Sequence, residues 1–167
     1  MPWLCAYTGA RVGEIVQLRK ADVREEDGVW TLSITPEAGT VKDKERRDVP
    51  VHRHLIDMGF LAFVNNAPKG QLFMWTGNGR AAWRTAKNHV TRFVRTVVKD
   101  PHIQPNHAWR HTFKTIGSEV GIQDKVLDAI CGHDPRTVGV GYGGVTLKAK
   151  TRAIKSFPRY AIGGRTG

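Results

Sequence analysis

A histidine and an arginine lie three residues apart in the segment 106–113 (NHAWRHTF). Pro105 before it suits the first turn of a helix, which would place His107 and Arg110 on one face. A guanidinium offers a planar fork of donors to phosphate oxygens, and an imidazole can donate or move a proton. The pair is therefore suited to phosphate chemistry, although taken alone the spacing is also typical of a solvated helix face.

An arginine and a glutamate lie one helical turn apart in the segment 8–14 (TGARVGE). Gly9 interrupts the helical pattern, so Arg11 leaves the break and Glu14 follows on the next turn. Two roles stay open for Glu14, which either orients Arg11 or stiffens the break. A surface ion pair at a helix start is the plainer interpretation, and it would contribute little stability.

A third candidate group lies nearer the end of the chain. Gly132 is predicted to end a helix and residues 134–135 (DP) to begin another, which puts His133 at the junction. A zinc site built on Cys131 and His133 lacks two further ligands at a suitable spacing, so no metal site is expected. Tyr142 stands among glycines after this junction, either as a surface tyrosine or as a group that must move.

These residues need elements to hold them, and the hydrophobic pattern predicts a mostly helical α+β domain. Alternation over 29–35 indicates a strand, and 47–51 is expected to pair with it in a small antiparallel sheet across a charged turn. Helices are predicted over residues 3–7, 11–18, 52–65, 79–99, 107–120, 123–131 and 147–157. The domain is expected to span residues 1–162, followed by a flexible tail at 163–167.

Positive charge is spread along the whole chain. Lys and Arg number 26 against 15 Asp and Glu, which gives a net charge of +11 and favours a polyanionic partner such as nucleic acid. A basic surface kept for solubility is the alternative. In the helix predicted at 79–99, four basic residues are candidates for DNA contact or, equally, for a solvated face: Arg84, Lys87, Arg92 and Arg95.

Length and cysteine content limit the class of protein further. At 167 residues with 40% hydrophobic content, the chain can build the core of one domain. Two cysteines are too few for a disulfide framework, and no apolar run reaches the roughly 20 residues of a membrane span. A cytoplasmic protein is expected.

Read in order, the candidate groups resemble the signature of one family. The pattern is Thr-Gly-x-Arg-x-x-Glu at 8–14, a lysine before a strand ending at 49–51 (VPV), His-x-x-Arg-His-Thr-Phe at 107–113, Gly-His at 132–133, and then Tyr142. This order resembles the catalytic domain of the tyrosine recombinases, the phage integrase family. The resemblance extends from residue 1 to about residue 157.

The resemblance implies a role for each candidate residue. Arg11 and Arg110 would clamp the scissile phosphate, with His107 and His133 as hydrogen-bonding companions. Tyr142 would be the nucleophile, and Glu14 would support the site. The general acid would be Lys42, whose distance from the strand proline fits the family better than that of its rival in the same loop, Lys44.

The resemblance also implies a reaction and its partners. Members of the family carry out site-specific recombination on double-stranded DNA through a 3′-phosphotyrosyl intermediate, without metal or cofactor, as homo-oligomers that are tetrameric on two sites. We therefore expect an enzyme that integrates or excises a phage or another mobile element and that acts at the nucleoid. Since the chain opens inside a predicted helix, an N-terminal DNA-binding domain is expected upstream.

Departures from the family pattern keep alternatives open. Residues 138–141 (VGVG) replace the Thr and polar residues that commonly precede the tyrosine, and Tyr160 is a second candidate nucleophile. Strand cleavage like that of a type IB topoisomerase, or a non-catalytic DNA-binding remnant of an integrase, are the rival functions. The basic helix predicted at 147–157 is expected to dock on a neighbouring protomer, as C-terminal segments of the family often do.

Overall fold

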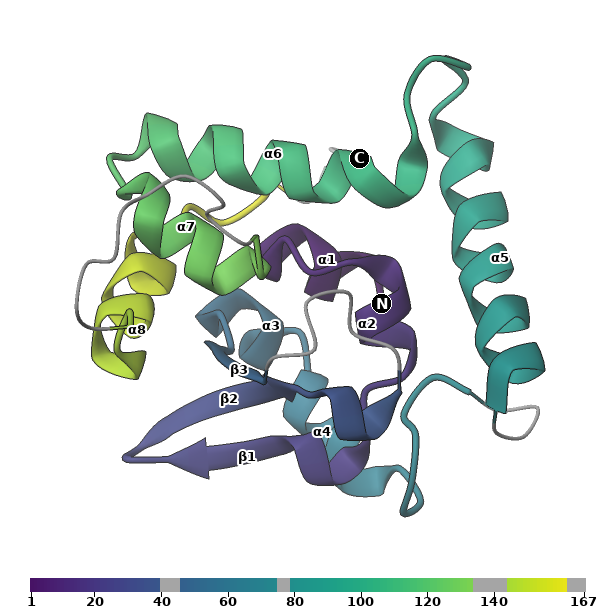
Figure 1. Cartoon of the computed structure of the whole chain (residues 1–167), viewed down its shortest axis with the longest axis horizontal. Coiled ribbons are helices and arrows are strands. Elements are labelled where there is room, and N and C mark those ends of the chain that lie inside the picture. Colours follow the sequence, from purple (N-terminus) through teal and green to yellow (C-terminus); the bar gives the residue numbers. More distant parts are fainter. Residues whose placement is uncertain (40–45, 75–78, 134–143, 162–167) are drawn as a thin grey trace, which may run out of the picture.

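A computed structural model describes residues 1–39, 46–74, 79–133 and 144–161 of the chain (Figure 1). Its fold is mostly helical with one small antiparallel sheet, which confirms the predicted class. In chain order the elements are α1 (Pro2–Thr8), α2 (Val12–Val16), the 3-10 turn η1 (Lys20–Asp22), β1 (Val23–Glu26), β2 (Val29–Ile34), η2 (Pro36–Ala38), β3 (Arg47–Pro50), α3 (Arg53–Asp57), α4 (Phe60–Asn66), α5 (Gly79–Val97), α6 (Pro105–Glu119), α7 (Asp124–Cys131) and α8 (Leu147–Ser156).

The sheet has three strands in the order β1-β2-β3, and each neighbouring pair is antiparallel. β2 and β3 agree with the predicted strands, and their register pairs Leu32 with Val49. β1 is an addition that the sequence analysis missed. It joins β2 through Asp27 and Gly28, whose positive φ values of 51° and 73° fit a two-residue hairpin turn that follows the twist of the strands.

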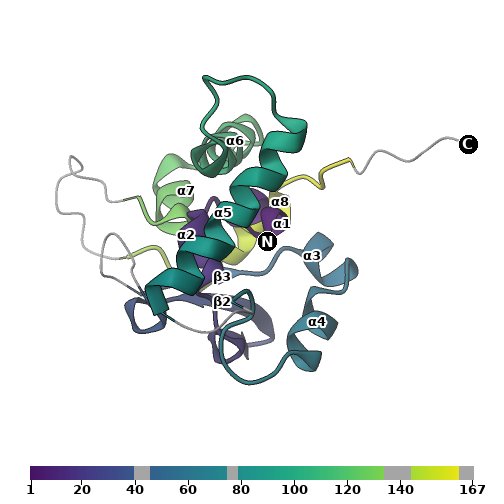
Figure 2. The same ribbon diagram turned by 90° about the vertical axis from the view of Figure 1, so that its right-hand side faces the viewer.

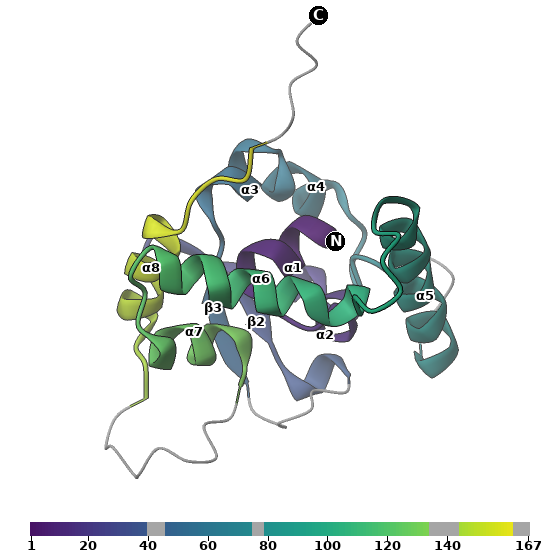
Figure 3. The same cartoon turned by 90° about the horizontal axis from the view of Figure 1, so that it is seen from above.

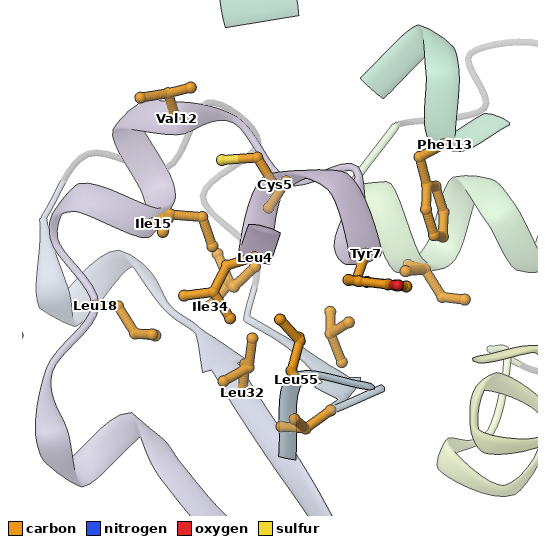
Figure 4. Packing of buried hydrophobic residues seen from close by; sticks show 14 of the residues in the cluster. Leu4, Cys5, Tyr7, Val12, Ile15, Leu18, Leu32, Ile34, Leu55 and Phe113 are labelled. Atoms are coloured by element: carbon orange, nitrogen blue, oxygen red, sulfur yellow. The ribbon is translucent and has the colours of Figure 1, made fainter. Parts of the chain in front are cut away.

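The helices pack around one core beneath α6. In Figures 1 and 3, α6 passes over α1 and extends from α5 at one end to α7 and α8 at the other. Figure 2 looks onto α5, which packs against α2. Figure 4 shows Leu4, Ile15 and Ile34 pointing toward one another between the first two helices and the sheet, and all three are buried. Burial of such side chains is the main force that holds these short helices.

Two predicted helices differ from the observed ones. The single helix expected at 52–65 is two helices, α3 and α4, because Gly59 between them has a φ of 85°, which a right-handed helix does not accommodate. The helix expected at 11–18 is the shorter α2, which ends at Val16. Along α5, Ala82, Ala86 and Val90 recur every fourth residue on the buried face, as amphipathic spacing requires.

None of the helices in the described part of the chain combines the length and apolar content needed to span a membrane.

Candidate active site

Arg110 projects from α6 into the junction of three segments. Its Nε donates to the carbonyl oxygen of Gly9 at 2.9 Å, and its two terminal nitrogens donate to those of Cys131 at 2.6 Å and Gly132 at 3.5 Å. The guanidinium therefore joins the turn after α1 to the C-terminal end of α7. Burial, and secondarily the positive charge of Arg11, lower the pKa of Arg110 from its usual value.

Gly9 lets these segments approach Arg110 closely. Its φ of 59° lies in the left-handed region, and it ends α1 with a hydrogen bond from its N–H to the carbonyl of Cys5. A Cβ at this position would lie 2.5 Å from the sulfur of Cys131 and 2.9 Å from the ring of Phe113. Both the backbone conformation and the packing therefore require glycine, and the break predicted at this position is observed.

Arg11 directly precedes α2, and Glu14 binds both its backbone and its side chain. Its backbone N–H donates to Glu14 Oε2 at 2.9 Å, and its guanidinium donates to Oε1 at 3.3 Å. The first bond satisfies an N–H that the start of a helix would otherwise leave without a partner. This is not the surface ion pair considered for the sequence, because the Glu14 side chain is only 2% exposed.

Glu14 is the carboxylate around which the arginines gather. Besides Arg11, its oxygens lie 2.6 Å from Arg47 and 3.9 Å from Arg110. Burial alone would raise the pKa of Glu14, but the charge of Arg47 and its hydrogen bonds, together with those of Arg11, outweigh this and hold the pKa below its usual value. The carboxylate is therefore ionised at neutral pH inside a cluster of three arginines.

Arg47 is a member of this cluster that the sequence analysis missed, since it treated the residue only as part of a strand. It lies in β3, is 9% exposed, and donates through Nε to the carbonyl of Ile130 at 3.1 Å. A signal was present: arginine at an inward position of a strand that continues Val-Pro-Val needs a buried anion. The sequence did not indicate that this anion is Glu14.

His107 stands in the first turn of α6 and is exposed. Together with Arg11 it lines a groove of about 760 Å³, bounded also by Glu14 and by Trp83 and Lys87 of α5. Of the two residues predicted on one face, His107 lines the groove, whereas the hydrogen bonds of Arg110 go to the backbone of the surrounding segments.

His133 follows Gly132, which ends α7 with a φ of 66°, as predicted for this junction. Its backbone N–H donates to the carbonyl of Asp128 at 3.0 Å, and its Nδ1 lies 3.3 Å from the carboxylate of the same residue. That carboxylate also accepts from Nζ of Lys114 at 2.7 Å, a bond that raises the pKa of Lys114. The imidazole is thereby fixed at one nitrogen while 58% of the side chain stays exposed.

Comparison with known proteins identifies the family of the chain. The model of the phage integrase family matches residues 1–142. The chain belongs to the phage integrase family. No curated protein sequence matches the chain at a significant level.

Solved structures of other integrases and recombinases share the fold. The integrase of mycobacterium phage Brujita is 21% identical with a TM-score of 0.66, and the match covers 99% of this chain and 53% of that one. XerH site-specific recombinase bound to difH substrate, in a pre-cleavage complex, is 19% identical with a TM-score of 0.56 over 79% of this chain and 38% of its own. A post-cleavage complex of XerH with palindromic difH is 19% identical with a TM-score of 0.57, and the match covers 79% of this chain and 37% of that one. The integrase-family chain therefore spans about half or less of these proteins.

Three of the predicted site residues lie outside the described part of the integrase-family chain: Lys42, its rival Lys44, and Tyr142. Tyr160, the second candidate nucleophile, is described. Its hydroxyl donates to the carbonyl of Ala6 at 3.2 Å, and burial raises its pKa to about 12. A phenol that is hydrogen-bonded as a donor and hard to ionise is poorly suited to attack a phosphate.

The four basic residues predicted on α5 fall into different settings. Arg84 and Arg92 are exposed, and Nζ of Lys87 lies 5.1 Å from the ring centre of Trp83 at the groove. Arg95 instead donates to the backbone carbonyls of Asp100 and Ile103, at 2.6 and 2.7 Å, and so braces the α5–α6 connection.

Arg80, at the start of α5, lines the groove and was not among the predicted residues. No group of three or more His, Cys, Asp and Glu side chains that could hold a metal ion occurs within the described ranges.

Proposed function

We propose that the chain is the catalytic part of a tyrosine recombinase, which cleaves and rejoins DNA strands at specific sites through a 3′-phosphotyrosyl intermediate. The observation that carries the proposal is the assembly of Arg11, Arg110 and Arg47 around Glu14, with His107 beside Arg11 on one groove. Such a site presents excess positive charge and hydrogen-bond donors, which a phosphate diester would neutralise and accept.

Each of the described residues has a step in this proposal. Arg11 and Arg110 would stabilise the negative charge that builds on the non-bridging oxygens in the transition state, which is usually the largest catalytic contribution. His107 and His133 would donate to the same oxygens. Removing either arginine would slow cleavage by on the order of 10²-fold or more.

The bonds exchanged are the same in cleavage and in rejoining. The phenol of Tyr142 loses its proton as it attacks phosphorus, and the bond from phosphorus to the 5′-oxygen breaks. Lys42 would protonate that oxygen. A 5′-hydroxyl from another strand then attacks the same phosphorus and gives its proton back to Lys42, while the phosphotyrosyl bond breaks and the phenol regains a proton. Because one phosphodiester is made for each one broken, the exchange needs no nucleotide triphosphate.

DNA is the substrate best matched to the groove and the charge. The chain carries a net charge of +11, and the groove continues from Arg11 and His107 to Arg80 and Lys87 on α5. XerH, which shares the fold, occurs bound to its difH substrate. In the proposed reaction, four copies of the protein act together on two DNA sites in the nucleoid.

Covalent trapping tests the reaction. The protein is mixed at low salt and in EDTA with nicked duplexes that carry random flanks, and denaturing gels are run beside Tyr142→Phe and Tyr160→Phe. We expect a slow-migrating adduct that only Tyr142→Phe abolishes. DNA binding without any adduct would favour a binding remnant or a need for another domain. An adduct lost only in Tyr160→Phe would overturn the site assignment, and relaxation of supercoiled plasmid without strand exchange would favour a topoisomerase.

A further inference from the structure

Arg47 lies beneath the proposed phosphate site and contacts two of the segments that form it. Its NH2 and NH1 donate to the two oxygens of Glu14 at 2.6 and 3.3 Å, and its Nε donates to the carbonyl of Ile130. The strand that carries it is separated from these partners by 33 and 83 residues of sequence. Arg47 therefore connects β3 with α2 and α7.

Arg47 and Arg110 together occupy the C-terminal end of α7. Arg47 binds the carbonyl of Ile130, and Arg110 binds those of Cys131 and Gly132. These carbonyls form the negative end of the helix dipole, which cations stabilise. The residue that follows is His133, so the two arginines fix the point from which its imidazole projects.

The guanidinium of Arg47 packs closely against Gly132. A Cβ on Gly132 would lie 2.4 Å from NH1 of Arg47 and 2.8 Å from its Nε. The guanidinium is thus flat against the backbone of Gly132, with Glu14 at its edge. Without Arg47, Arg11 and the more distant Arg110 would be the charged partners left to the buried carboxylate among the described residues.

We propose that Arg47 is a positioning residue of the phosphate site, which holds the side chain of Glu14 between the two clamp arginines and fixes the end of α7 that presents His133. It acts through these groups and does not touch the phosphate. The inference rests on the proposed function for its catalytic readout. The inference adds to that function an arginine that neither clamps the phosphate nor transfers a proton.

The first experiment compares adduct formation by wild type, Arg47→Met, Arg47→Lys and Arg46→Met in single turnover. Arg47→Met keeps the length of the side chain without its charge, and Arg46 is a matched neighbour that is 53% exposed. We expect Arg47→Met to lose about 10²-fold in rate, as displacement of a site by about 1 Å can cost. Arg47→Lys should lose less, Arg46→Met should stay within about threefold of wild type, and an Arg47→Met rate equal to that of Arg46→Met would overturn the proposal.

The pH dependence separates positioning from a general loss of structure. The titratable or charged groups that face Glu14 are Arg11, Arg47, Arg110 and the buried thiol of Cys5. Without Arg47, burial raises the pKa of Glu14. The rate of Arg47→Met relative to wild type should therefore rise as pH increases from about 5 to about 8. A ratio that is flat with pH would contradict action through Glu14.

A double variant keeps the test valid where Arg47→Met folds poorly. In a Glu14→Gln background the buried carboxylate is absent, so Arg47→Met should fold and should cost much less additional rate than it does in wild type. Additive losses would refute coupling through Glu14.

Failure of the proposed function is recognised separately, with inorganic phosphate as the probe. If wild type gives no adduct, the Nε resonances of Arg11 and Arg110 are titrated with phosphate in wild type and in the Arg47 variant that folds. Weaker binding by about tenfold in the variant would support the positioning role even where the recombinase assignment had failed. Equal binding would overturn it.

Discussion

Gly132→Ala is expected to damage the site more than a matched glycine substitution elsewhere. Gly132 and Gly121 both follow a helix and both have left-handed backbone, with φ values of 66° and 79°. An added Cβ meets nothing within 4 Å at Gly121, but at Gly132 it lies 2.4 Å from the guanidinium of Arg47. The two substitutions therefore share the backbone strain and differ in the clash.

The magnitude follows from these two contributions. Left-handed backbone costs an alanine about 1–2 kcal/mol, and this applies to both variants. Moving a tightly packed group typically costs about 1–3 kcal/mol more, which applies to Gly132→Ala alone. The guanidinium is the end of a flexible side chain, but its hydrogen bonds to Glu14 and Ile130 resist displacement. We expect Gly132→Ala to lower the free energy of unfolding by about 2–5 kcal/mol and Gly121→Ala by about 1–2.

Urea unfolding of the two variants measures the stability difference, and single-turnover adduct formation measures its effect on the site. Gly132→Ala should slow adduct formation even below its unfolding midpoint, because Arg47 and the end of α7 shift together. Gly121→Ala should react as wild type. Equal unfolding free energies for the two variants, or equal rates, would show that Arg47 accommodates the added methyl and that its placement is not critical.

Three further predictions concern the other described residues. Asp128→Asn should slow adduct formation by about tenfold, because the carboxylate beside Nδ1 of His133 fixes the tautomer of the ring, whereas the exposed Asp124→Asn should have no effect on the gel assay. Tyr160→Phe should retain adduct formation while it loses about 0.5–1.5 kcal/mol in urea unfolding, through the bond to Ala6. Glu14 has a lowered pKa in the folded state, so its contribution to stability is present above its unfolded pKa and is lost as pH falls through the folded value. Between pH 3 and 6, the free energy of unfolding should therefore fall more steeply with decreasing pH in wild type than in Glu14→Gln. Parallel curves for the two proteins would contradict a lowered pKa of Glu14.

Local pattern predicted most of the elements but missed one strand and one break. The alternation of apolar and polar residues in 29–35 was sufficient to predict β2, and the apolar residues at every fourth position were sufficient to predict α5, because each element buries one face. β1 was missed because Val23–Glu26 has too few apolar residues to alternate, although Asp27-Gly28 is itself a strong hairpin signal. The break at Gly59 was missed because one isolated glycine inside a helical pattern does not by itself indicate left-handed backbone.

The contacts of the candidate site also differ in whether the sequence could predict them. Arg11 with Glu14 lies within one turn, so sequence spacing alone could indicate the contact. The bonds of Arg110 to Gly9 and of Arg47 to Ile130 cross 101 and 83 residues, and only the packed fold brings them together. Arg47 illustrates why spacing fails there: its partners are one carboxylate and one backbone carbonyl, neither of which leaves a pattern near the arginine.

The balance of charge in the cluster suits the anion binding that we propose. Arg11, Arg47 and Arg110 surround this single carboxylate, so three positive charges meet one negative charge among the described residues. Without Glu14, mutual repulsion and burial would oppose the assembly, and both already lower the pKa of Arg110. With a second carboxylate, only one positive charge would remain in excess, and the cluster would attract a phosphate less strongly. One carboxylate, bound by Arg47 at the edge of the groove, lets the cluster fold while positive charge remains for the proposed phosphate and for the additional negative charge of its transition state.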